Sequence, residues 1–169
     1  MKLCNDVITV FNARVDPEEG GNVWMPTVIT GVSWWATDAS TVDASKGGLV
    51  AANRVTVRIP ADAIAEGKAY ADPISYRNAD SVADLWTLQN GDIIVRGDVS
   101  DTQTSSGSAG DAAILHGGEG WTPAKLRKAF AHCATIVGVT DNRRMAAAPL
   151  RLRAGLYASN APHWKVTAT

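Results

Sequence analysis

Short apolar runs separated by turn residues recur along the whole chain. Over residues 54–60, Val55, Val57 and Ile59 alternate with polar residues, which is the pattern of a half-buried strand. The run over residues 93–95 is apolar without alternation, so we expect a strand covered on both faces there. Further strands are expected where β-branched and aromatic residues gather, at residues 7–11, 23–25, 27–30, 32–35, 134–140 and 164–167, with a kink or bulge at Gly31.

The segment from Leu85 to Gly97 reads LWTLQNGDIIVRG. Its Asn90-Gly91 pair lies between two apolar runs, and Asn-Gly in this setting is the strongest short-range signal for a β-hairpin. Nothing in the segment has the pattern of a catalytic nucleophile or a phosphate-binding loop. We therefore predict a stiff hairpin that serves the framework of the fold.

One helix has clear boundaries in the sequence. Thr122 suits the N-cap and Pro123 suits the first helical position. Leu126 and Phe130 lie four residues apart and share one face. We expect this helix to end near His132.

Two segments depart from the strand pattern. Residues 100–121 are rich in Ser, Gly and Thr, so they bury too little surface to offset the entropy of ordering, and a mobile loop is expected. Residues 145–160 are expected to form an inserted hairpin or arm. The whole pattern predicts a single domain over residues 1–169, mainly β, as a small antiparallel β barrel or sandwich with one short α-helix, a long flexible loop and a C-terminal arm or hairpin.

Composition narrows the classes of function. The 169 residues are 46% hydrophobic and carry a formal net charge of −1, which allows a core but gives no general attraction to nucleic acid or an acidic membrane. No run approaches the ~18 apolar residues of a membrane span, and the N-terminus does not resemble a signal peptide. Cys4 and Cys133 fit neither a zinc site nor a disulfide framework, so two free thiols are expected.

Candidate groups for catalysis and ligand binding are sparse. His116, His132 and His163 do not pair at the spacing of metal ligands, and the Gly-rich pieces match no phosphate-binding loop. Cys133 directly follows His132, but neighbours on a strand face opposite ways, so a structural thiol is favoured over a catalytic pair. The sequence therefore predicts no enzymatic activity, no metal and no cofactor.

Six tryptophans raise the question of binding. Tryptophans provide stacking platforms for bases, hot spots for protein interfaces, or filling for a β-barrel core. Trp34 and Trp35 are adjacent, so they must face opposite ways in a regular strand. We expect about four of the six in the core and an interface role for Trp35 or Trp164. The six are Trp24, Trp34, Trp35, Trp86, Trp121 and Trp164.

The last third of the chain is locally basic, because no acidic residue follows Asp141. Two interpretations of this basic patch stay open. It is either a solvated hairpin edge whose charges prevent aggregation, or a docking segment that meets an acidic neighbour or DNA phosphates. The basic residues are Arg143, Arg144, Arg151, Arg153 and Lys165.

The succession VITVFN, VW…TVITGVSWW, RVTVRIP, LWTLQNGDIIVRG, TIVGVTDNRR and APHWKV resembles a family of small structural proteins. These proteins belong to tailed phages and prophages of Gram-positive bacteria and are encoded where the head genes meet the tail genes. The resemblance covers residues 7–166 and is weakest over residues 100–130. This chain departs from the family at residues 145–160, where an insertion puts the usual C-terminal interface in doubt.

The resemblance implies a virion protein of the head-to-tail connector, made in the host bacterial cytoplasm. Its expected role is a subunit of the head-closure (stopper) ring, which seals packaged DNA and docks the tail. Such rings are commonly of six or twelve subunits, with the portal or adaptor ring above and the tail or tail-terminator ring below. Double-stranded DNA would pass the lumen without sequence-specific binding, and no membrane partner is expected.

Two other classes of function stay open. One is a tail terminator or another neck or minor capsid protein. The more remote one is a β barrel that binds single-stranded nucleic acid or a glycan. For the connector, the interface candidates are Arg143, Arg144, Arg151, Arg153, Trp35 and Trp164, and the candidates for a lumen or gate loop are Ser105, Gly107, Gly110, His116 and Gly118.

Overall fold

The structure, a computed structural model, describes residues 4–15, 22–37, 40–43, 48–51, 54–99, 123–143 and 162–169. Of residues 22, 40–43 and 48–51 it describes the backbone alone. The predicted loop at residues 100–121 and the predicted arm at residues 145–160 lie outside the described residues.

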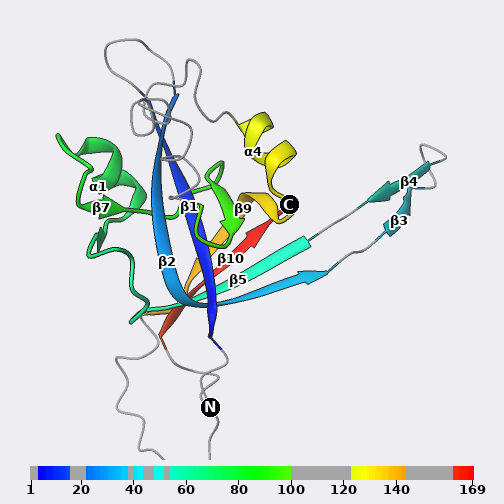
Figure 1. Ribbon diagram of the computed structural model, residues 1–169, viewed down its shortest axis with the longest axis horizontal. Coiled ribbons are helices and arrows are strands. Elements are labelled where there is room, and N and C mark those ends of the chain that lie inside the picture. The colour runs from blue at the N-terminus through cyan, green and yellow to red at the C-terminus, as the bar shows by residue number, and fades with distance from the viewer. Residues whose placement is uncertain are drawn as a thin grey trace, which may run out of the picture.

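Strands make up most of the described chain, in agreement with the predicted fold class (Figure 1). Every strand predicted from the apolar runs has a counterpart. The strands are β1 (Asp6–Val15), β2 (Asn22–Thr37), β3 (Ser40–Asp43), β4 (Gly48–Ala51), β5 (Arg54–Pro60), β6 (Ala69–Tyr70), β7 (Leu85–Trp86), β8 (Ile93–Arg96), β9 (Cys133–Asp141) and β10 (His163–Ala168).

Two short helices accompany the strands within the described residues. The predicted helix is α4 (Pro123–Ala129), with Leu126 buried on its inner face. The second helix is α1 (Pro73–Asn78), which was not predicted from the sequence. It forms because the Asp72 side chain caps it, accepting hydrogen bonds from the backbone N–H groups of Ile74 and Ser75 at 3.0 and 3.1 Å.

Six strands close into an antiparallel barrel in the order β1-β2-β5-β10-β9-β8. The predicted bulge at Gly31 is confirmed, because the pairing of β1 with β2 passes from Val7↔Thr30 to Asp6↔Val32 and leaves Gly31 unpaired, with φ +78°. The barrel interior is filled by apolar side chains from every strand. Its fully buried members include Ile8, Val10, Ile29, Val32, Val57, Ile59, Ile94 and Val166.

A second apolar cluster lies outside the barrel, where α4 covers β8. Ile93 and Val95 pack there with Phe11 and with Leu126 of α4, whereas Ile94 points into the barrel. All three residues of the β8 run are buried. The prediction of a strand covered on both faces is therefore confirmed.

The predicted hairpin at Leu85–Gly97 is wrong. β7 pairs in parallel with β6, and β8 pairs with β1 and β9 instead of with β7. The Asn-Gly turn does form, with the Asp92 N–H donating to the Gln89 carbonyl at 3.3 Å. However, the Asp92 carboxylate also accepts the backbone N–H of Ala13 at 2.9 Å, which ties the turn to β1. The strand before the turn (β7) therefore belongs to the two-stranded β6–β7 sheet, whereas the strand after it (β8) belongs to the barrel.

Candidate interaction surface

A two-stranded ribbon extends β2 and β5 beyond the barrel. Thr37 pairs with Arg54 at the end of the β2–β5 ladder. Three residues further on, Ser40 pairs with Ala51 in the same register, and the β3–β4 ladder continues to the pair of Asp43 with Gly48. The two ladders share one antiparallel register but are separate sheets. We call β3 and β4, together with the pair of Thr37 and Arg54, the ribbon.

The ribbon has no further strand beside it among the described residues. β1 accompanies β2 only as far as Val32, and β10 accompanies β5 only as far as Val55. Figure 1 shows the ribbon projecting away from the barrel on the side opposite to α1. An isolated two-stranded hairpin is only marginally stable in water, so the ribbon is suited to being covered by a partner.

Trp35 lies at the base of the ribbon with half of its surface exposed (50%). Its neighbour Trp34 is 7% exposed and belongs to the barrel core. The prediction that these two rings face opposite ways is confirmed. A large exposed aromatic ring beside an uncovered ribbon is a typical anchor for a protein contact.

The other tryptophans follow the prediction with one correction. Trp24, Trp34, Trp86 and Trp164 are buried, which confirms four in the core, and Trp121 lies outside the described residues. An interface role for Trp164 is wrong, because its side chain is only 3% exposed. β10 lies between β5 and β9 in the closed barrel, so this inward-facing position packs against Tyr70 at 4.6 Å between ring centroids.

Arg143 is held by contacts within the chain. Its guanidinium group lies 4.2 Å from the Trp164 ring centroid and 4.5 Å from that of Tyr70. Two of its three donor nitrogens also donate to the Asp141 carboxylate, from Nε to Oδ1 at 2.9 Å and from Nη2 to Oδ2 at 2.7 Å. These hydrogen bonds raise the pKa of Arg143 further. The contacts fix Arg143 over the aromatic rings instead of presenting it for docking.

The remaining predicted site residues cannot be placed. Arg144, Arg151 and Arg153 lie outside the described residues, and so do Ser105, Gly107, Gly110, His116 and Gly118. Lys165 is exposed on β10. The predicted docking and gate roles therefore stay predictions.

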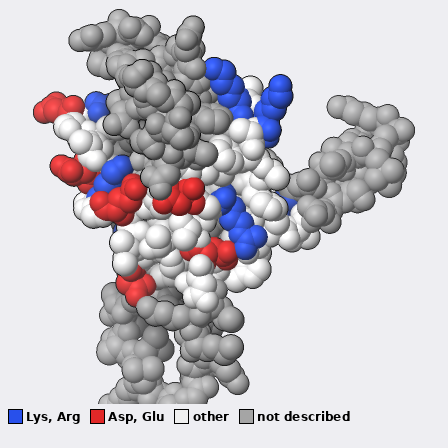
Figure 2. All heavy atoms as spheres, viewed as in Figure 1, with Lys and Arg blue, Asp and Glu red and all other residues white. Residues whose placement is uncertain are grey.

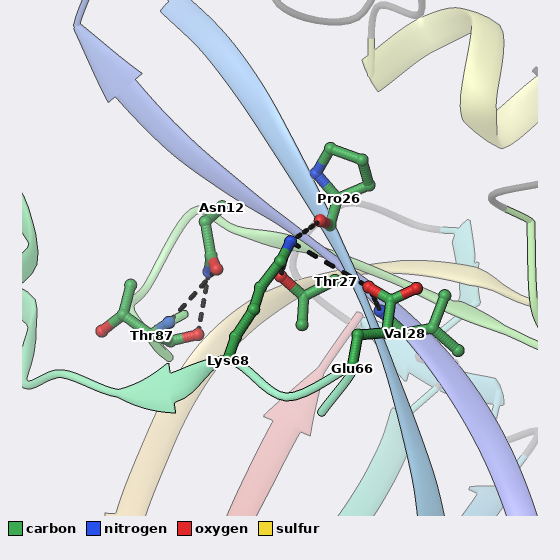
Figure 3. A network of polar contacts seen from close by, with 7 residues as sticks. All are labelled: Asn12, Pro26, Thr27, Val28, Glu66, Lys68 and Thr87. Carbon is green, nitrogen blue, oxygen red and sulfur yellow. Dashed lines mark hydrogen bonds and ion pairs between the residues drawn. The ribbon is translucent and has the colours of Figure 1, made fainter. Parts of the chain in front are cut away.

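The free edge of β2 between Pro26 and Thr30 is closed by side chains (Figure 3). The Glu66 carboxylate accepts the backbone N–H of Val28 at 3.1 Å. The Lys68 ammonium group donates to the Pro26 carbonyl at 2.8 Å and to the Thr27 hydroxyl at 3.2 Å. Glu66 has φ +52°, so the chain turns sharply enough for both side chains to reach the strand. This edge is not open to a partner strand.

Asp92 is a buried carboxylate that sequence reasoning missed. Its oxygens accept hydrogen bonds from Asn12 Nδ2 at 2.7 Å, from Ala13 N at 2.9 Å and from Gln89 N at 3.1 Å. Burial nevertheless raises its pKa to about 6. Asn12 also pairs with the backbone of Thr87 through both its amide nitrogen and its amide oxygen, as Figure 3 shows. The arrangement ties β1 to the segment before β8.

A groove runs along one edge of β9. β8 pairs with β9 only over Cys133–Thr135, and the last contact is the Gly91 N–H to the Ile136 carbonyl at 2.9 Å. Beyond this point a hollow of about 500 Å³ opens between β9, α1 and the turn before β8. We call it the β9 groove. Its lining residues are Pro73, Arg77, Leu88, Gln89, Asn90, Gly138 and Val139.

Comparison with known proteins places the chain in a family. The chain belongs to a family of unknown function (DUF6751), whose model matches residues 3–169. No curated protein and no solved structure matches the chain. The barrel, the ribbon and the β9 groove therefore all lie within the part of the chain that defines DUF6751 membership.

The two cysteines of this DUF6751 chain are half-buried or nearly so. Burial raises the pKa of the Cys133 thiol. Cys4 and Cys133 are both free, as predicted. In the described ranges, no group of three or more His, Cys, Asp or Glu residues is placed to hold a metal ion. None of the described helices has the length and apolar character needed to cross a membrane.

Proposed function

We propose that this DUF6751 protein is a structural subunit of the head-to-tail connector of a tailed phage, and specifically of its head-closure ring. The observation that carries the proposal is the ribbon, which continues the register of the barrel ladder far beyond the barrel. A rigid barrel that fixes a long projecting ribbon is a design for joining subunits. It is consistent with the connector family that the sequence resembles.

The surface charge supports contact between different faces of the same chain. Figure 2 shows acidic side chains gathered over α1 and its flanks, and basic side chains over α4. Patches of opposite charge on different parts of the surface favour a head-to-tail contact between copies, which generates a ring where the rotation closes. The exposed acidic residues in the segment around α1 are Asp62, Glu66, Asp72, Asp80 and Asp84, where Arg77 is the exposed basic residue of α1, and the exposed basic residues of α4 are Lys125, Arg127 and Lys128. Asp98 and Asp141 are exposed outside both groups.

The near-neutral net charge suits a ring through which DNA moves. A chain with a formal net charge of −1 makes few phosphate contacts overall. Many such contacts on every subunit would hold the DNA and oppose its passage. The protein is therefore better suited to docking other proteins than to gripping the genome.

The proposal is tested by electron microscopy of particles from a phage that lacks the gene for this chain. Emptied heads beside separate tails of normal length are expected, because the seal on the packaged DNA is missing. Supplying the intact gene from a plasmid is the control and should restore infectious particles. DNA-filled heads beside tails of abnormal length would replace head closure with tail termination. Normal infectious particles would overturn the connector proposal.

A further inference from the structure

The backbone of β9 is open toward the β9 groove. The Asn142 N–H donates to the His163 carbonyl at 2.9 Å, which fixes the hydrogen-bonded pairs between β9 and β10. Because these pairs alternate along an antiparallel ladder, Thr140 bonds to Lys165, whereas the pair of Val139 with Val166 is not hydrogen-bonded. The N–H and C=O groups of Val139 therefore point away from β10 and toward the groove.

The groove has the form of a site for an extended peptide. Its walls are the β9 edge on one side and Pro73, Arg77 and the turn at residues 88–90 on the other. Leu88 is buried and Val139 packs against the barrel core, and Arg77, Gln89 and Asn90 add polar groups to the lining. The volume of about 500 Å³ falls within the usual range for ligand sites. An open strand edge binds a further strand through main-chain hydrogen bonds.

The ribbon supplies the matching strand edge. Past Thr37 and Val55, neither of its strands has a neighbouring strand among the described residues. An unpaired edge of this kind is a template for pairing with another chain.

The ribbon and the groove of one copy lie on opposite sides of the barrel. Figure 1 shows the ribbon projecting away from the side that carries α1, and α1 contributes Pro73 and Arg77 to the groove. A ribbon projecting this way is directed toward the groove of another copy and away from its own. Each copy then gives one ribbon and receives one, which is a heterologous contact that forms a ring where the rotation between copies closes.

We propose that the ribbon of one copy pairs with the β9 edge of the next copy, in the groove between α1 and the turn at residues 88–90. This inference rests on the proposed function, because it assumes that the subunits form a ring. It goes further because it names the two surfaces and the hydrogen-bonding edge that join the subunits.

The test is amide hydrogen exchange in the full chain, read at single residues over a range of protein concentrations. As copies associate, exchange at the Val139 N–H should slow by at least about tenfold, because the incoming strand accepts this hydrogen. The Thr140 N–H is the internal control and should be slow at every concentration, since β10 already accepts it. Association without slowing at Val139 would overturn the proposal, and so would a lack of association up to millimolar concentration.

Two variants block the two surfaces separately. Asn90→Trp fills the groove from an exposed position on its lining, and its control is Asn78→Trp, which is exposed on α1 outside the lining. In the second variant, an Asn-Gly turn replaces residues 38–53 and joins Thr37 directly to its partner Arg54. Asn90→Trp and the shortened ribbon should each abolish the protection at Val139 and leave the circular dichroism of the barrel unchanged. Protection that persists in either variant would contradict the inference.

The result of the exchange experiment can be told apart from the result of the gene deletion that tests the proposed function. A head-closure phenotype together with unprotected Val139 would retain the connector and reject this subunit contact. Protected Val139 together with normal particles from the gene deletion would retain the contact and reject the connector.

Discussion

The side-chain nitrogen of Asn12 donates a 2.7 Å hydrogen bond to the buried carboxylate of Asp92, across 80 positions of the chain. This bond joins β1 to the turn before β8, where the barrel closes. The same carboxylate accepts backbone N–H groups from Ala13 and Gln89. One side chain therefore ties β1 to the turn at residues 88–90, directly beyond the pair of Phe11 with Ile93 in the β1–β8 ladder.

Replacing Asp92 by alanine should destabilise the barrel strongly. The change leaves buried donors of Asn12, Ala13 and Gln89 without their acceptor. Because unpaired buried donors are costly, we expect the free energy of unfolding to fall by about 2–4 kcal/mol. Urea denaturation followed by circular dichroism measures it. Asp80→Ala, at an exposed position, is the control and should change stability by less than about 0.5 kcal/mol.

The raised pKa of Asp92 should make stability fall as the pH rises. Its pKa is about 6 in the folded state, compared with an ordinary value of 3.8, because burial disfavours the charged form. The folded protein thus binds more protons than the unfolded chain between about pH 4 and pH 6, so this group's contribution is largest below pH 4 and is lost through that window. A shift of about two units corresponds to about 3 kcal/mol.

The comparison that isolates this effect is wild type against Asp92→Asn, measured by urea denaturation from pH 4 to pH 7. Asp6 and Asp72 have lowered pKa values and act in the opposite direction, but they are present in both proteins and cancel in the difference. The stability of wild type relative to the variant should decrease across this range. A difference that stays constant with pH would show that Asp92 does not titrate there.

Lys68 should protect the edge of β2 from pairing with other chains. Its ammonium group donates to the Pro26 carbonyl and the Thr27 hydroxyl, and burial lowers its pKa. Lys68→Met removes both hydrogen bonds, so we expect a loss of about 1–2 kcal/mol and aggregation that increases with concentration. Light scattering and urea denaturation measure the two effects. Lys165→Met, at an exposed position on β10, should show neither.

The sequence predicts the barrel strands well because their signals are local. Alternation over residues 54–60 and the continuous apolar run at residues 93–95 reflect one covered face and two covered faces, respectively. The same reasoning predicts that Trp34 and Trp35 face opposite ways, and in the structure Trp34 is inside and Trp35 outside. These predictions need only the side-chain period of a strand and no knowledge of which strands are neighbours.

The features that the sequence does not reveal depend on distant partners. The Asn90-Gly91 turn is typical of a hairpin, but the contact of Asp92 with Ala13 decides which strands it connects. The β9 groove likewise exists only because α1 and the turn at residues 88–90 come to lie beside one edge of β9. No local pattern encodes such contacts, so the interaction surface becomes visible only in the folded chain.

Trp35 should matter for assembly and hardly at all for folding. Its ring is half exposed at the base of the ribbon, so Trp35→Ala should change the free energy of unfolding by less than about 0.5 kcal/mol. Trp34→Ala is the matched control on the opposite face, where removing a buried ring should cost about 3–5 kcal/mol. Urea denaturation of both variants tests this contrast.

If Trp35 anchors the subunit contact, the Trp35→Ala gene should also fail to restore infectious particles in the deletion phage, although the variant folds. A variant that folds and restores full infectivity would remove Trp35 from the interface.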